Sequence, residues 1–291
     1  MFEQLFSIIA PVLIAAAIGY AWARFDRPFD AEMVSHLVTT VGVPCLVFSI
    51  LVKVEVDFEA LGRMAGAAMA VLVITTVLGL VFLKVWGQSI RAFLPSVVMA
   101  NTGNMGLPLS FLAFGSEGMA LSVAYFTVSA VIGFSAAMMV ASGGTSLSAF
   151  LRIPPLYATL IALVFMYTGW QVPAWAGNTV DMLADFAIPL MLITLGVSLA
   201  NLKVQSLKRS TVVATFRMLV GFAIGWGLAE VLGFEGAMRG VLILQSAMPV
   251  AVFNYLFAMR YETEPEAVAG SVVISTVASF ITLPALLWFI L

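Results

Sequence analysis

Apolar residues fill most of the chain in long runs that are separated by short polar connections. A membrane-spanning helix needs about 20 predominantly apolar residues. Ten runs approach this length: 5–23, 34–52, 60–83, 92–114, 118–140, 154–169, 180–200, 210–232, 236–259 and 267–291. The pattern predicts an all-α polytopic membrane protein with ten transmembrane helices. The longest polar connection, 141–153, is the expected cytoplasmic linker between two five-helix halves, 1–140 and 154–291.

The fourth run is interrupted where a membrane helix should be most apolar. It contains Asn101-Thr-Gly-Asn-Met-Gly-Leu-Pro108, with no formal charge between Arg91 and Glu117. Backbone amides that leave a helix at membrane depth cost several kcal/mol unless something pairs with them. Such breaks are tolerated where they are buried in protein or line a wet cavity. The sequence therefore predicts a discontinuous helix whose break forms a binding site.

The two halves resemble weak copies of each other. Three pairs of prolines recur at offsets of 145, 141 and 144 residues: Pro44 and Pro189, Pro108 and Pro249, Pro11 and Pro155. Five spans per half is an odd number, so the second copy enters the membrane inverted. Inverted repeats with broken helices are typical of secondary transporters. The repeat pairs the break in 92–114 with a second break in 236–259.

We expect the two breaks to form one site. Half-helix N-termini carry partial positive charge and attract anions, so amides and dipoles should hold a carboxylate there without a buried lysine or arginine. Polar residues that only tie helices together would give the same pattern. The candidate substrate-binding residues are Asn101, Thr102, Asn104, Pro108, Gln245, Ser246, Pro249 and Asn254, with Phe48, Tyr125 and Tyr255 as candidate apolar wall residues.

Three other features of the sequence lead to further predictions. Asp185, one turn after Asp181, is a candidate for proton or sodium coupling, although an acid at the start of a helix is favoured by the dipole alone. We interpret Arg217 as a side chain that snorkels to the interface. The pairs Gly62/Gly66 and Gly221/Gly225 fit the spacing of close helix contacts.

Composition narrows the class of protein further. Only 10% of the 291 residues are charged, against about 25% in soluble domains, which leaves little room for an extramembrane domain. The one cysteine, Cys45, and the one histidine, His36, exclude an intrachain disulfide and a multi-histidine or cysteine metal site. A net charge of −2 without a basic run gives no indication of nucleic-acid binding. We expect no cofactor and no metal.

The motif Asn101-Thr-Gly-Asn-Met-Gly-Leu-Pro108, preceded by Gly42-Val-Pro-Cys-Leu-Val-Phe48, resembles the auxin efflux carrier family in its compact bacterial form. The resemblance implies a fold like that of the bile acid sodium symporters, with broken fourth and ninth helices that cross. It also implies a scaffold and homodimer surface from the first, second, sixth and seventh helices, and an elevator-like transport domain from the third to fifth and eighth to tenth. Family members carry organic acids such as auxin, malonate or malate. Asn101, Asn104, Pro108 and Pro249 match the crossover residues of the family, whereas Gln245-Ser246 replaces its second Asn-Thr-Gly-Asn run.

The basic residues of the loops predict the orientation. With the N-terminus outside, nine lysines and arginines fall in inner loops and three in outer loops, so both termini are expected outside the bacterial inner membrane. The expected function is secondary transport of small organic anions in contact with lipid. A sodium-coupled organic anion symporter, a channel and an intramembrane enzyme are the alternatives, although no nucleophile with a base is evident for an enzyme.

Overall fold

The computed structural model describes residues 2–53, 57–133, 136, 139–140, 154–202, 204 and 206–291. Its first half contains α1 (Phe2–Arg24), α2 (Ala31–Leu37), η1 (Val38–Gly42), α3 (Val43–Lys53), α4 (Phe58–Trp86), α5 (Ile90–Val98), η2 (Thr102–Gly106), α6 (Leu107–Val128) and η3 (Ser129–Gly133). The second half contains α8 (Pro154–Thr168), α9 (Ala174–Asp185), α10 (Ala187–Asn201), α11 (Leu207–Val231), α12 (Gly236–Ser246), α13 (Phe253–Arg260) and α14 (Pro265–Ile290). The η elements are single wide turns that continue the neighbouring α-helices. The expected linker 141–153 lies outside the described residues.

Helix occupies each of the ten predicted apolar ranges, and the described chain contains no β-strand. In the described ranges, seven continuous helical stretches are long and apolar enough to cross a membrane, and α8 is a shorter apolar helix. One of the seven, Thr102–Gly133, contains Gly115 with φ 63° and ψ −151°. This backbone geometry favours glycine, and it turns the chain between the fourth and fifth predicted ranges. The protein is an all-helical polytopic membrane protein.

The seventh predicted range begins too late. Helix α9 starts at Ala174, directly after Pro173, six residues before the expected start. Asp181 and Asp185 are therefore not in the first turn of a helix. The helix is interrupted at Phe186, because Pro189 in α10 has no N–H for the carbonyl of Asp185.

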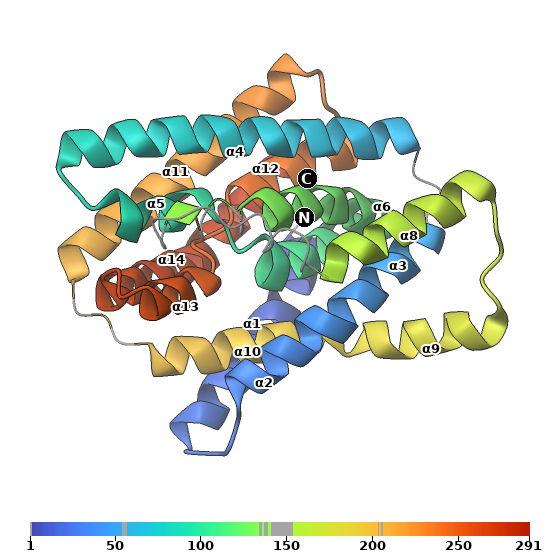
Figure 1. Cartoon of the computed structure of the whole chain (residues 1–291), viewed down its shortest axis with the longest axis horizontal. Helices are drawn as coiled ribbons and strands as arrows, with labels where there is room; N and C mark the ends of the chain where they lie inside the picture. The colour runs from blue at the N-terminus through green and yellow to red at the C-terminus, as the bar shows by residue number, and fades with distance from the viewer. Residues whose placement is uncertain are drawn as a thin grey trace.

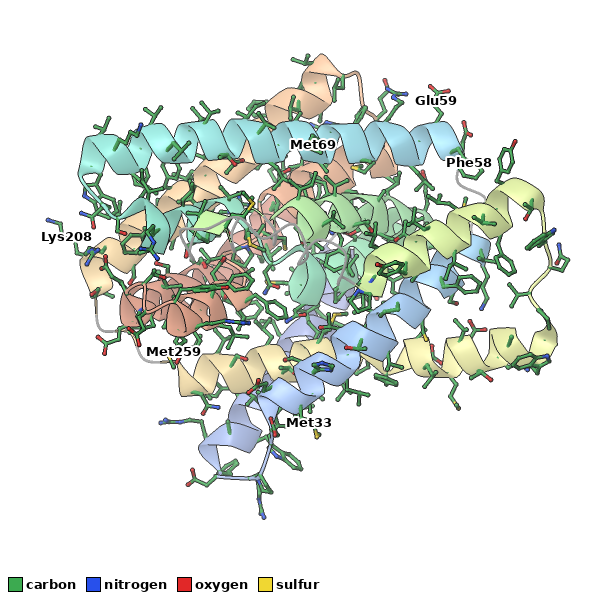
Figure 2. The ribbon with its side chains drawn as sticks, in the orientation of Figure 1. Met33, Phe58, Glu59, Met69, Lys208 and Met259 are labelled. Atoms are coloured by element: carbon green, nitrogen blue, oxygen red, sulfur yellow. The ribbon has the colours of Figure 1, made fainter. Side chains whose placement is uncertain are left out.

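The helices pack in two groups (Figure 1). Helix α1 packs along α10, and α3 packs against α8 and α9. Helix α4 packs against α5 and α6, while α11 packs against α12 and α14. In Figure 1, α4 follows one long edge of the molecule, and α2, α9 and α10 lie along the opposite edge. Lys208 and Glu59 lie at opposite ends of the long axis (Figure 2). Large apolar side chains such as Ile14, Val77 and Ile281 are exposed, as expected of a lipid-facing surface.

Close helix approach depends on one of the two predicted glycine pairs. A Cβ added at Gly221 of α11 would overlap the backbone carbonyl oxygen of Ser246, and one at Gly225 would crowd the Ser246 side chain. This close contact of α11 with the end of α12 confirms the role of the pair. In contrast, a Cβ at Gly62 or Gly66 would meet no atom within 4 Å, so that pair makes no close contact with the residues that the structure describes.

Candidate functional site

Two helix interruptions meet in the interior of the protein. The chain leaves helical geometry between α5 and η2 and again between α12 and α13. Ala100 and Val250 form an antiparallel bridge at this point. The N–H of Asn101 donates to the carbonyl of Pro249 at 2.8 Å, and the N–H of Ala251 donates to the carbonyl of Met99 at 3.1 Å. We call residues 99–108 and 245–254 the crossover.

The crossover gives hydrogen-bond partners to backbone groups that the two breaks release from helical hydrogen bonding. Each break pairs part of its released backbone with the other break. Two side chains satisfy more of it: the Ser275 hydroxyl of α14 accepts from the N–H of Val250 at 3.0 Å, and the Asn254 amide donates to the carbonyl of Met99 at 3.2 Å. Asn254 is therefore engaged in holding the two breaks together.

A cavity of about 60 Å³ opens beside the first break. Asn101, Thr102 and Asn104 line it, and Thr39 and Met191 contribute from the helices of the other packing group. Asn101 is 4% exposed, and its side-chain nitrogen has no hydrogen-bond partner among the described residues. The first turn of η2 also begins here, and the leading N–H groups of a helix lack intrahelical partners. The cavity therefore presents hydrogen-bond donors to whatever enters it.

Gln245 and Ser246 tie the end of α12 to α6 and do not line the cavity. The Gln245 amide donates to the hydroxyl of Ser122. The Ser246 hydroxyl lies 3.2 Å from the hydroxyl of Tyr125, and Tyr125 does line the cavity. A Cβ at Gly106 would overlap the Gln245 amide, so a glycine at this position lets the two half-helices approach.

The remaining candidates lie in different places. Pro108 is buried at the start of α6, and Pro249 supplies the carbonyl that accepts from Asn101. Phe48 packs edge-on against Phe165 of α8, with ring centroids 5.4 Å apart, and does not line the cavity. Asp185 is exposed at the end of α9, away from the cavity lining.

Asp181, one turn before Asp185, accepts from the Ser49 hydroxyl at 2.6 Å and pairs with the Lys53 ammonium at 2.5 Å. This network joins α9 to the end of α3, so Asp181 has a structural role between the two helices.

Arg217 belongs to the site, although its place in the sequence did not indicate this. The interpretation that it snorkels to the interface is wrong, because its side chain is 1% exposed and lines the cavity. Its Nη2 donates to the carbonyl of Ser246 at 2.9 Å. The expectation of a site without a buried cation is wrong for the same reason. The glycine spacing could have shown that Arg217 points inward. Gly221 and Gly225 lie one and two turns after Arg217 on the same helical face, and this face contacts α12.

No acidic side chain is among the described residues that line the cavity. The described histidine, cysteine, aspartate and glutamate residues also form no group of three that could hold a metal ion. The arrangement is that of a donor-rich site with one cation.

Comparison with known proteins identifies the family. A family model described as "Membrane transport protein" matches residues 135–287, which is 153 of the 291 residues. An "Uncharacterized transporter" of Methanothermobacter thermautotrophicus is 27% identical over 305 aligned positions, covering 98% of this chain and 96% of the relative. Auxin efflux carrier component 8 of Arabidopsis thaliana is 27% identical over 128 positions, covering 41% of this chain and 35% of the plant protein. The chain belongs to the auxin efflux carrier family.

An uncharacterized transporter of Methanocaldococcus jannaschii is similar along 98% of both chains at 22% identity. The family and these relatives are transporters, so this auxin efflux carrier family member is a membrane transporter and not an enzyme. Its cargo is a small molecule.

Proposed function

We propose that the protein is a secondary carrier of small organic anions and that the substrate carboxylate binds at the crossover. The observation that carries this proposal is the pairing of the two helix breaks at Ala100 and Val250, beside a cavity that Asn101 and Thr102 line. Half-helix N-termini and unpartnered amide donors favour an anion. The absence of acidic groups among the described lining residues further favours this substrate class.

We further propose that the chain crosses the membrane ten times, in two inverted five-helix repeats that comprise residues 1–140 and 154–291. The fourth and ninth spans cross at their breaks. The turn at Gly115 supports the separation of the fourth and fifth spans. Each break follows a long helix and then a short one: α4 and α5 precede the first break, and α11 and α12 precede the second. This shared order of elements supports the repeat. Both termini lie outside the bacterial inner membrane in this proposal, with Lys208 and Glu59 toward opposite faces (Figure 2).

The mechanism proposal is elevator-like alternating access. Helices α1, α2, α3, α8, α9 and α10 form the scaffold and the homodimer surface, and α4, α5, α6, α11, α12, α13 and α14 carry the substrate. The packing of α1 on α10 and of α4 on α5 and α6 supports these groups. The cavity lies where the two groups meet, since Thr39, Val43 and Met191 of the scaffold face Asn101 and Thr102. A sliding step at this boundary would expose the cavity to each side in turn.

The size of the cavity favours small acids in this state. A volume of about 60 Å³ holds a few waters at roughly 10–15 Å³ each. It is far below the roughly 300–1,000 Å³ of pockets for drug-sized ligands. Short acids such as malonate or malate fit this space better than an auxin-like acid, which would require the cavity to open.

The test is uptake into proteoliposomes that contain the purified protein. Labelled malonate, malate and indole-3-acetate are offered separately, with choline and malonamide as cationic and neutral controls. The proposal predicts saturable uptake of an acid that is stimulated by the same acid on the opposite side, whereas non-saturable flux indicates a channel. Uptake of choline or malonamide in place of every acid would overturn the anion proposal.

The same assay, repeated with and without sodium, tests whether substrate transport is coupled to an ion. Flux that depends steeply on sodium supports the alternative of a sodium-coupled organic anion symporter. Flux without sodium supports uniport or proton-linked transport. Asp185→Asn tests whether that exposed carboxylate carries coupling: loss of the proton or sodium dependence with retained exchange would assign it the role.

A further inference from the structure

Arg217 is a charged side chain in the middle of a membrane-spanning helix. It lies ten residues into α11, about 15 Å from the helix start at a rise of 1.5 Å per residue. Within the part of the chain that the structure describes, its Nε and Nη1 have no hydrogen-bond partner. The salt bridges found in the described part of the chain join other residues: Lys53 with Asp181, Arg209 with Glu264 and Arg239 with Glu230.

The bond from Arg217 to Ser246 does not account for a full charge. Ser246 is the last residue of α12, and a cation near a helix C-terminus is favourable. The desolvation of a buried ion exceeds that gain, and buried ions are therefore normally paired. A neutral donor such as glutamine would satisfy the same carbonyl. The two unpartnered nitrogens indicate that the charge has a partner of another kind.

The surroundings of Arg217 identify the kind of partner. The guanidinium lines the same cavity as Asn101 and Tyr125. Guanidinium, amide and phenol all donate hydrogen bonds, and oxyanions accept them. The position is also built by packing, because Gly221 brings α11 so close to α12 that a Cβ there would overlap the Ser246 carbonyl.

We propose that Arg217 is the built-in counter-charge of the substrate carboxylate, in place of a co-bound inorganic cation. This inference rests on the anion site proposed above and assigns its charge partner. With one substrate carboxylate paired to Arg217, the charge of the guanidinium is neutralised inside the protein. Without substrate, the moving helices carry an unpaired buried cation across the membrane. The carrier consequently exchanges anions faster than it returns empty, and it binds acids without sodium.

The binding test compares acids with their neutral amides. Wild-type protein, Arg217→Gln and Arg217→Lys are titrated with malonate, malonamide, indole-3-acetate and indole-3-acetamide, in sodium-free buffer. Glutamine keeps a donor for the Ser246 carbonyl and removes the charge, so it disturbs the fold least. Arg63→Met, which removes an exposed arginine of α4, is the matched control.

We expect Arg217→Gln to weaken acid binding about 10- to 100-fold, the range for a lost charged hydrogen bond, while amide binding stays near the wild-type value. Arg217→Lys retains most of the preference for acid, and Arg63→Met retains all of it. If Arg217→Gln prefers the acid as strongly as wild type does, Arg217 only caps α12 and the inference is wrong. If the wild-type protein itself shows no preference for acids, the proposed function fails, and the two failures are thus distinguishable.

A flux measurement on the wild-type protein needs no variant. Proteoliposomes loaded with the bound acid are diluted into buffer with or without the same acid. We expect efflux to be at least several-fold faster when acid is present outside, with no sodium in either compartment. Equal rates, or an absolute requirement for sodium, would overturn the inference even if every Arg217 variant failed to fold.

Discussion

Asn101 and Asn254 are both almost fully buried, one in each of the two segments that form the crossover. Replacing each of them with alanine tests substrate binding and protein stability separately. Asn101 is 4% and Asn254 is 2% exposed. The Asn254 amide donates to the Met99 carbonyl at 3.2 Å, whereas the Asn101 amide nitrogen has no partner in the described ranges. Asn254→Ala should therefore lower the free energy of unfolding by about 0.5–1.5 kcal/mol. The loss stays modest because the Met99 carbonyl still accepts from the N–H of Ala251.

Asn101→Ala should have the opposite profile. It removes an unpartnered buried donor, so the protein without substrate stays as stable as wild type or becomes more stable. Binding of the acid loses about 1–3 kcal/mol, which is roughly 5- to 150-fold in Kd. At 100 times the wild-type Kd, the acid stabilises wild type by about 2.7 kcal/mol, and a variant with a 50-fold higher Kd by only about 0.7 kcal/mol.

The assay is thermal unfolding of the two purified variants and wild type in detergent, with and without the acid at that concentration. Asn254→Ala should unfold at a lower temperature and keep the wild-type shift with acid. Asn101→Ala should keep the wild-type midpoint and lose about three-quarters of the shift. The reverse pattern, with binding lost in Asn254→Ala and kept in Asn101→Ala, would refute the assignment of the site.

Three further substitutions test the contact of α11 with α12 and the charge pair at the end of α3. Gly221→Ala should lower the free energy of unfolding by about 1–3 kcal/mol, the usual range for overpacking, because the new Cβ overlaps the Ser246 carbonyl. Gly62→Ala, whose Cβ meets no described atom within 4 Å, should leave the free energy of unfolding unchanged or raise it by about 0.5–1 kcal/mol. Equal thermal midpoints for these two variants would contradict the close contact of α11 with α12. Lys53→Ala should lower the free energy of unfolding by only about 0.2–1 kcal/mol, because the side chains of Lys53 and Asp181 are 57% and 35% exposed. The difference in stability from wild type should shrink as the salt concentration is raised toward 1 M. A loss that is larger and independent of salt would indicate a tighter pair than the structure contains.

The helix breaks could be predicted because their chemistry is local. Proline and consecutive polar residues in an apolar run conflict with a continuous membrane helix, wherever the run lies in the fold. The sequence therefore indicated the break near Asn101 and that near Pro249. That Ala100 pairs with Val250 follows from the three-dimensional arrangement of the two halves, for which the proline offsets gave only indirect evidence.

Arg217 and Phe48 were misjudged for a common reason. Both lie in helices that are apolar on nearly all sides, so hydrophobic periodicity does not reveal which face is inward. The depth of Arg217 was also underestimated, because α11 begins at Leu207 and not at Ser210. Phe48 faces Phe165 of α8 and not the cavity. Side-chain direction in such helices depends on tertiary packing.

The most direct test of the central claim is a ligand-bound structure of the carrier at saturating concentration of the acid that binds best. We expect density for the acid in the crossover cavity, with a carboxylate oxygen at about 2.7–3.2 Å from the Asn101 side-chain nitrogen and the carboxylate facing Arg217. Density for the acid only in another cavity, such as that between α1, α10 and α14 lined by Tyr20 and Asn201, with the crossover cavity empty, would contradict it.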